Sequence, residues 1–190
     1  SIKYDAGWGN WVNLHSDTRK KVYASMGGFF YRKNEIKSSL YNIWSTIRIR
    51  PMDAFSITLN PQLSLNQREL QYVTSDEFGE NNETEYIFAS IDRKTLSFTI
   101  RLDYNITPEL TIQYYGQPYF SAGKYTDFKR ITNPQAEDAK NQFVYLTENE
   151  HVYNSESDEY LLSLHDETLT IENPDFNSKF FNSNLVIRWE

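Results

Sequence analysis

Cysteine and long hydrophobic runs are both missing from this sequence of 190 residues. Without cysteine the chain forms no disulfide and no Cys-ligated zinc site, and it has no thiol nucleophile. The longest apolar run, counting glycine, is the six residues Met26–Tyr31, whereas a transmembrane helix needs about 18 or more. A lack of thiols fits an oxidising compartment as well as a reducing one. The sequence therefore excludes a helical membrane protein and leaves the compartment open.

Recognised catalytic motifs are missing as well. The three histidines, His15, His151 and His165, are scattered and form no HExxH pair. No G-x-S-x-G, P-loop or G-x-G-x-x-G occurs. The first residues lack the charged and apolar regions of a signal peptide, so any export signal is expected to be upstream or already removed. We expect no cofactor, and a non-enzymatic protein more than an enzyme.

The net charge of −7 comes from one region. Residues 133–182 hold 11 acidic residues against two basic ones, which is a local charge of −9, while the rest holds 15 acidic and 17 basic residues. No basic stripe typical of nucleic-acid binding is present. We expect residues 131–182 to form one long acidic external loop. Its apolar pieces, residues 143–146 and 160–164, indicate that it is partly ordered, as a small hairpin or a lid.

Aromatic residues make up 16% of the chain, which a disordered segment would not carry. Apolar and polar residues alternate strictly from Thr95 to Ile106, and the same alternation occurs in residues 41–50, 54–65 and 185–190. A period of two is the signature of a β-strand with two different faces. The sequence predicts an all-β protein.

The predicted strands are long and their connections alternate in length. We expect seven strands, at about residues 8–15, 20–31, 38–50, 54–74, 83–106, 110–130 and 183–190. Short turns at 16–19, 51–53 and 107–109 alternate with longer polar connections. About 9–11 residues of a tilted strand cross a bilayer, and outer-membrane barrels have short periplasmic turns and long external loops. The pattern predicts an antiparallel transmembrane β-barrel of about seven or eight long strands.

One stretch, residues 91–95, interrupts the fifth strand, because the apolar residues change from odd to even positions there. A β-bulge shifts alternation by one residue, and a hairpin would split the strand in two. We favour the bulge, because a hairpin would place the turn at 107–109 on the opposite side from the turn at 51–53.

The barrel hypothesis assigns three sets of residues. The lipid-facing residues are Phe55, Ile57, Leu59, Leu96, Phe98, Ile100, Leu102, Leu110, Ile112, Leu185 and Ile187. The charged residues expected in the lumen are Arg48, Arg50, Arg101, Asp103, Arg188 and Glu190. The aromatic residues expected at the membrane interface, where rings with a polar tip are favoured, are Trp8, Trp11, Tyr41, Tyr104, Tyr114 and Trp189.

Each assignment has an alternative. The lumen charges either select solutes, as charged rings do in pores, or form a solvated, salt-bridged interior, which we favour because a barrel lumen is polar by default. The alternating strands also suit a soluble β-sandwich binding module. We favour the membrane, because a sandwich seldom needs so many strands with an apolar face of a dozen residues.

The acidic segment raises two further hypotheses. Glu156, Asp158 and Glu159 offer clustered oxygen ligands of the type that calcium prefers, although the spacing is not that of an EF-hand. A glycan hydrolase would need paired carboxylates at a defined separation, either in 131–182 or in an absent N-terminal part. A solvated external loop is the favoured interpretation, and we assign no catalytic residue.

Seven strands with both ends in the periplasm cannot close, because such barrels have an even strand number. We therefore expect residues 1–190 to be a single barrel domain that lacks neighbouring strands, or the C-terminal part of a larger barrel. The expected partners are the lipid bilayer and further barrel strands or envelope protein subunits.

Three stretches resemble a known family: Thr95–Tyr125, Asn173–Asn177 and Leu185–Glu190. They are similar to the C-terminal region of a Bacteroidota outer-membrane family, whose members carry a family-9-like carbohydrate-binding domain followed by a large barrel domain of unknown function. In that family the Arg188-Trp-Glu190 motif is followed by one more strand. The resemblance implies a bacterial outer-membrane protein that passes, binds or anchors material, with a glycan-derived ligand as one candidate, but it places no sugar-binding residue here.

Overall fold

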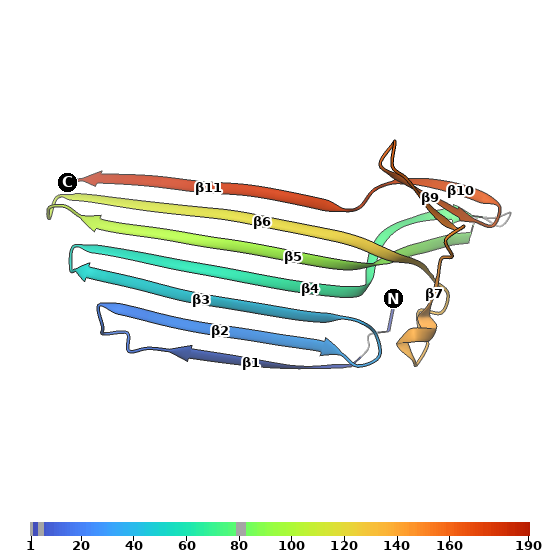
Figure 1. Ribbon diagram of the computed structural model, residues 1–190, viewed down its shortest axis with the longest axis horizontal. Helices are drawn as coiled ribbons and strands as arrows, with labels where there is room; N and C mark the ends of the chain where they lie inside the picture. The colour runs from blue at the N-terminus through green and yellow to red at the C-terminus, as the bar shows by residue number, and fades with distance from the viewer. Residues whose placement is uncertain (1, 4–5, 79–82) are drawn as a thin grey trace.

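The computed structural model describes residues 2–3, 6–78 and 83–190 and has an antiparallel all-β fold (Figure 1). One long sheet has the strand order β1-β2-β3-β4-β5-β6-β11, and β7 pairs with the C-terminal end of β6. The strands of this sheet are β1 (Gly7–His15), β2 (Val22–Lys33), β3 (Ser39–Met52), β4 (Phe55–Phe78), β5 (Glu83–Asn105), β6 (Leu110–Ile131), β7 (Phe143–Tyr145) and β11 (Phe176–Trp189). The predicted all-β, antiparallel class is confirmed. Seven long strands match the seven predicted, and the short strands β7 to β10 were not among them.

The two ends of the sheet differ, as Figure 1 shows. The short turns after β1, β3 and β5 lie at one end together with the C-terminus, and the longer connections lie at the other. We call these the turn end and the loop end. The sheet is open: its order begins at β1 and finishes at β11, and no ladder joins these two strands in the described part of the chain. Of the described residues, none belongs to a helix long and apolar enough to span a membrane.

The last strand is longer than the sequence predicted. It begins at Phe176 rather than at 183, and it pairs with β6 from Gly123 down to Leu110. Residues 176–184 are rich in Asn, Ser and Phe and show no clean alternation. Their strand conformation follows from the free edge of β6, whose backbone groups need partners.

The fifth strand is neither split nor bulged at 91–95. β5 is continuous, and its pairing with both neighbours is regular from Ile91 to Ser97. The irregularities lie in the neighbours: β4 has extra residues between Arg68 and Gln71 and between Tyr72 and Thr74. β6 has one between Thr126 and Lys129, where Asp127 has a φ of 51°. The predicted bulge is therefore wrong in its position.

The change of apolar positions in β5 has a different cause. Because β5 alternates regularly, its odd residues Ile87, Ala89 and Ile91 face the opposite side from its even residues Leu96 to Leu102. Ile87 and Ala89 are fully buried. The strand keeps its register and changes the face that carries apolar side chains.

The acidic segment is an ordered cap, residues 132–175, rather than an open loop. It contains the 3₁₀ helix η1 (Ala139–Gln142), β7, and a separate three-stranded sheet of β8 (His151–Asn154), β9 (Glu159–Leu164) and β10 (Glu167–Glu172). The partial order expected from residues 143–146 and 160–164 is confirmed, since both pieces contribute buried residues.

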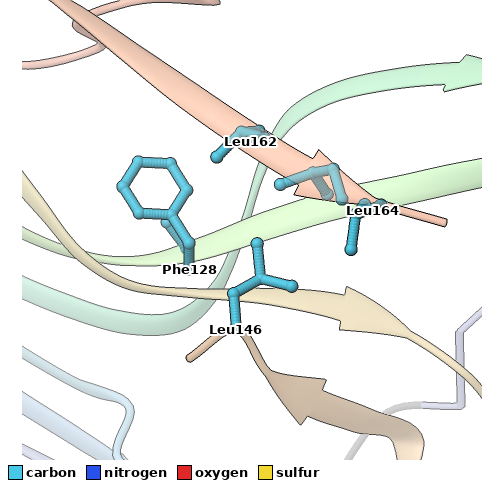
Figure 2. Packing of buried hydrophobic residues seen from close by; sticks show 6 residues of the cluster. Phe128, Leu146, Leu162 and Leu164 are labelled. Atoms are coloured by element: carbon cyan, nitrogen blue, oxygen red, sulfur yellow. The ribbon is translucent and has the colours of Figure 1, made fainter. Parts of the chain in front are cut away.

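The small sheet packs on the loop end of β5 and β6 (Figure 2). Leu162 and Leu164 of β9 point toward Phe128 and Leu146, and this cluster also contains Ile87 and Ala89. The cap therefore covers the side of β5 that its odd residues face.

A second contact joins the cap to the β2–β3 connection. Ile36 packs with Ala139 and Phe143, and the Ala139 N–H donates to the Glu35 carboxylate over 2.7 Å. Segment 132–146 thus reaches from β6 to the opposite part of the sheet, at the same end as the small sheet.

Candidate functional site

The cross-strand register collects apolar side chains on one face of all seven long strands. Directly paired residues share a face, and one such row reads Val22, Ile49, Ile57, Leu102, Tyr114 and Leu185. The residues predicted to face lipid all lie on this face: Phe55, Ile57, Leu59, Leu96, Phe98, Ile100, Leu102, Leu110, Ile112, Leu185 and Ile187. We call this surface the apolar band.

The apolar band has a defined height. On this face, no charged side chain occurs from Phe55 to Leu65 in β4 or from Leu96 to Tyr104 in β5. Lys94, Lys124 and Lys179 mark its limit toward the loop end. Eleven residues of β4 span about 34 Å along the strand, which at a tilt of about 45° gives about 24 Å, close to the apolar height of outer-membrane barrels.

No part of the described chain covers the apolar band. Leu96 is 47% exposed, Ile43 43% and Leu185 60%. Large apolar side chains of a soluble protein are normally buried, and broad apolar patches mark interaction surfaces. The small sheet β8–β10 does not bury them, because it packs against the opposite face of β5. The β7 segment of the cap packs near Leu70 and Ile131, beyond the loop-end limit of the apolar band.

Aromatic side chains gather at both limits of the apolar band. Toward the loop end, the rings of Trp8, Phe30 and Tyr41 are in contact in series, edge-to-face and tilted, with ring centroids 5.0 and 4.7 Å apart. Toward the turn end, Phe55 meets Tyr104 edge-to-face at 5.4 Å. Amphipathic rings favour the two membrane interfaces.

The six predicted interface residues divide between the two faces. Tyr104, Tyr114 and Trp189 lie on the apolar face near the turn end, and Trp8 and Tyr41 lie on it near the loop end. The register places Trp11 on the other face, opposite Phe29.

The opposite face, which we call the polar face, carries the predicted lumen charges. One row reads Tyr23, Arg48, Thr58, Arg101, Tyr115 and Asn184. The Arg48 guanidinium lies 5.2 Å from the Tyr23 ring centroid, and the Arg101 guanidinium lies 5.8 Å from that of Tyr115. Arg50 and Arg188 follow at alternate positions on β3 and β11 toward the turn end, and Glu190 comes directly after β11.

The acidic member of this set does not neutralise the arginines directly. The Asp103 carboxylate accepts a hydrogen bond from the Gln113 amide over 3.1 Å. Asp103, Gln113, Arg101 and Asn184 line a shallow depression of about 250 Å³. Near the turn end, the polar face is thus an open surface on which tyrosine rings orient the guanidinium groups of Arg48 and Arg101.

Sequence reasoning missed two arginines of the polar face. Arg93 pairs with Asn66, and Arg68 pairs with Ile91, so both arginines continue the polar face toward the loop end. Arg68 and Asn66 line a second depression of about 390 Å³, together with Tyr31 and Lys33. The sequence signal for these arginines was the period of two, continued past residue 95. The change of the apolar positions at 91–95 obscured this signal.

The polar face is also less uniformly polar than the sequence suggested. The Trp44 indole lies over Gly27, where a Cβ atom would collide with it. Tyr119 and Phe180 pair across β6 and β11 with centroids 6.1 Å apart. Polar hydroxyl and amide residues of β4 and β5 separate these two aromatic groups.

A buried ion pair joins β4 to β6, and the cap contacts it through Tyr145. The Lys129 ammonium, which has no exposed surface, donates to the Glu69 carboxylate at 2.8 Å and to the Ser90 hydroxyl at 3.0 Å. The Tyr145 hydroxyl of β7 donates to the same carboxylate oxygen at 2.6 Å. Buried charges are tolerated when they are paired and hydrogen-bonded in this way.

The environment of this pair shifts its pKa values. Burial disfavours the Glu69 anion, but the hydrogen bonds from Lys129 and Tyr145 and the lysine charge outweigh it, so the pKa of Glu69 lies below its ordinary value. Burial lowers the pKa of Lys129, against the opposing effect of Glu69. Burial and the neighbouring carboxylate raise the pKa of Tyr145.

The candidate calcium ligands do not come together. The Asp158 carboxylate accepts hydrogen bonds from Tyr153 and Asn173, both at 2.8 Å, and these bonds lower its pKa. Glu156 lies in the turn after β8, and Glu159 begins β9. The described residues contain no group of three His, Asp or Glu side chains placed to hold a metal ion. Of the three, Asp158 connects the β8–β9 turn to Tyr153 and Asn173.

Comparison with known proteins gives a family and no function. No curated protein and no solved structure matches the chain. The model of a family described as a domain of unknown function, DUF5916, matches residues 1–190. The chain therefore belongs to the DUF5916 family.

Proposed function

We propose that this chain forms part of the wall of an outer-membrane β-barrel in the bacterial cell envelope. The apolar band faces lipid, and the polar face lines an interior where material passes, binds or is anchored. The observation that carries the proposal is the uncovered, charge-free apolar face shared by all seven long strands. The resemblance described above adds glycan-derived compounds to the expected material.

Two further features support the proposal. The height of the apolar band, about 24 Å, fits the apolar zone of a barrel, and aromatic side chains lie at both of its limits. The short turns lie at one end and the long connections with the cap at the other, which is the arrangement of periplasmic turns and external loops.

A soluble β-sandwich fits these features less well. A sandwich buries its apolar face under a second sheet. Here the second sheet, β8–β10, packs on the side of β5 that continues the polar face, at the loop end only. The apolar band stays uncovered by the described chain.

The proposal includes additional strands. Backbone groups at a lipid-exposed sheet edge need hydrogen-bond partners, which is why membrane sheets close. In the open sheet, β1 and β11 are the two edges. We therefore expect further barrel strands or envelope subunits to pair with both.

Adjacent substitutions in β5 test the assignment of the two faces. Ile100 lies in the middle of the apolar band and Thr99 lies on the polar face. An arginine at the bilayer midplane costs about 2–4 kcal/mol on the lipid face of a barrel strand and much less in the lumen. In the full-length protein, Ile100→Arg should reduce the fraction recovered folded in the outer membrane, whereas the matched control Thr99→Arg should assemble normally.

Membrane fractionation, resistance to carbonate extraction and heat-modifiable migration measure this difference. Equal behaviour of the two variants would contradict the lipid-facing assignment. Recovery of the unmodified protein as a monodisperse monomer in detergent-free buffer would contradict the membrane location itself.

A further inference from the structure

Arginine is concentrated on the polar face. Six of the nine arginines of the chain lie there: Arg48, Arg50, Arg68, Arg93, Arg101 and Arg188. From Arg68 and Arg93 to the turn end, the acidic residues on the same face of the seven long strands, and directly after the last, are Asp103 and Glu190. Beyond these arginines, Asp76, Glu85 and Arg130 continue this face at the loop end, where the small sheet packs. The polar face is thus strongly cationic in a chain whose net charge is −7.

These arginines are not neutralised by carboxylates. In the described part of the chain, ion pairs join Arg19 to Asp17, Lys129 to Glu69, and Glu85 to both Arg130 and His165. None of these pairs involves one of the six arginines named above. A salt-bridged structural interior would require such pairs.

Tyrosine rings and, for Arg48, the Thr18 carbonyl at 3.2 Å hold two of the arginines in place of carboxylates. Arg48 lies over Tyr23 and Arg101 lies over Tyr115. A cation over a ring is oriented but keeps its full charge. Thr58 lies between the two arginines in the same row, one strand spacing from each.

Arg68 and Arg93 form a second pair of arginines nearer the loop end. Arg93 is opposite Asn66, two positions from Arg68, so the two arginines are diagonal neighbours on one face. Like charges at neighbouring cross-strand positions repel. The depression of about 390 Å³ beside Arg68 and Asn66 leaves space for a ligand next to this pair.

The acidic cap does not compensate for this charge. It packs on the continuation of the polar face at the loop end, but none of its described carboxylates lies within ion-pair distance of these arginines. The cationic surface therefore stays free along the height of the apolar band.

We infer that the polar face binds and guides anionic solutes, namely organic compounds that carry carboxylate, phosphate or sulfate groups. This inference rests on the proposed function, because it names the solute class of the proposed interior. A surface charge of one sign against a low-dielectric wall concentrates counter-ions. The planar guanidinium group binds oxyanions through two parallel hydrogen bonds.

A single cysteine reports the local potential, because the chain contains no other. Thr58→Cys places a thiol between Arg48 and Arg101. In vesicle-inserted full-length protein, in which any cysteine outside residues 1–190 is replaced by serine, the thiol is treated with a negatively charged and with a positively charged methanethiosulfonate reagent. The measured quantity is the rate with the negatively charged reagent divided by the rate with the positively charged one. A potential of about +1 kT per charge should raise this ratio about 7-fold above that of a free thiol in water.

Removing the arginines supplies the causal test. In the Thr58→Cys background, Arg48→Gln together with Arg101→Gln should return the ratio to within about twofold of the free thiol. Arg19→Gln is the matched control, because Arg19 lies at the turn end and is paired with Asp17; it should leave the ratio unchanged. Raising the salt from about 0.1 to 1 M, which shortens the Debye length from about 10 to 3 Å, should also lower the ratio.

The outcomes separate this inference from the proposed function. Leu59→Cys places a thiol on the apolar band, one residue away. If the Leu59→Cys thiol reacts as fast as the Thr58→Cys thiol, the lipid-facing assignment fails. If Leu59→Cys is protected while Thr58→Cys reacts without charge preference, or reacts with neither reagent, the proposed function stands and the anionic-solute inference is overturned.

Discussion

The two halves of β5 use apolar side chains in opposite ways. Toward the turn end, Leu96, Phe98, Ile100 and Leu102 lie on a face that no described part of the chain covers. Toward the loop end, Ile87 and Ala89 lie on the other face and are fully buried under the cap. One strand with a regular register thus has two different apolar faces, each in its own half.

The difference indicates two different surroundings. The loop-end half has the features of a water-soluble protein: a small apolar core, a buried ion pair and an acidic surface. The turn-end half has a single layer whose apolar side stays uncovered. Such a division is expected for a strand that leaves a bilayer and continues into water.

Among these variants, Lys129→Met should change the stability of the cap most, relative to that of the apolar band. The substitution leaves the buried Glu69 carboxylate without its cation, and breaking a buried pair costs about 3–5 kcal/mol. The cap should open while the apolar band stays intact. Hydrogen exchange should rise in residues 143–164 and stay unchanged in residues 55–65.

A double variant controls this experiment. Lys129→Met with Glu69→Gln removes both charges and keeps an acceptor for the Tyr145 hydroxyl, so protection of the cap should partly return. Unchanged exchange in Lys129→Met would show that the ion pair does not hold the cap.

Leucine truncations compare the two apolar regions directly. Leu162→Ala empties a fully buried site in the cap and should cost about 2–5 kcal/mol. Leu63→Ala lies on the apolar band, where Leu63 is 36% exposed, so under the proposed membrane location lipid would fill the space. Chemical unfolding in detergent or vesicles should show a clearly smaller loss for Leu63→Ala, and equal losses would contradict the lipid-facing assignment.

Acid should produce the smallest effect and act on the cap alone. The pKa of Glu69 is below its ordinary value in the folded state, so the unfolded state binds more protons between the two values. The stabilisation that ionised Glu69 gives the folded state is present above about pH 4.3, the pKa of glutamate in the unfolded chain. It is lost as the pH falls through the pKa of Glu69 in the folded state. The loss is smaller than in Lys129→Met, because a neutral carboxyl still accepts hydrogen bonds.

Tryptic cleavage in residues 132–175 after incubation at decreasing pH would measure this loss. Glu69→Gln removes the titrating group, so it should flatten the profile between pH 4.5 and the folded pKa. A profile identical to that of the unmodified protein would assign the transition to other carboxylates.

Much of the sheet could be predicted from local patterns. Strict alternation located β3 to β6 to within a few residues, because each strand has one face in a uniform environment. The face of each predicted lipid-facing residue also followed from the period of two. The start of β11 could not be predicted, because its polar residues 177–179 extend the sheet only by pairing with the edge of β6.

Long-range pairing decided the rest. Trp11 belongs to the polar face because β1 is in register with β2, and Arg68 joins Arg93 because β4 and β5 are paired beyond the apolar band. The Lys129–Glu69 pair joins residues 60 positions apart. No local period carries information on such partners.

The sequence by itself determined that this chain forms long, two-faced antiparallel strands, because alternation needs only neighbouring residues. Only the tertiary structure decided that the acidic segment is a cap, that β5 changes its apolar face without a bulge, and that six arginines share one surface. These features depend on which strand ends meet, and register between distant segments is set by pairing and packing rather than by local composition.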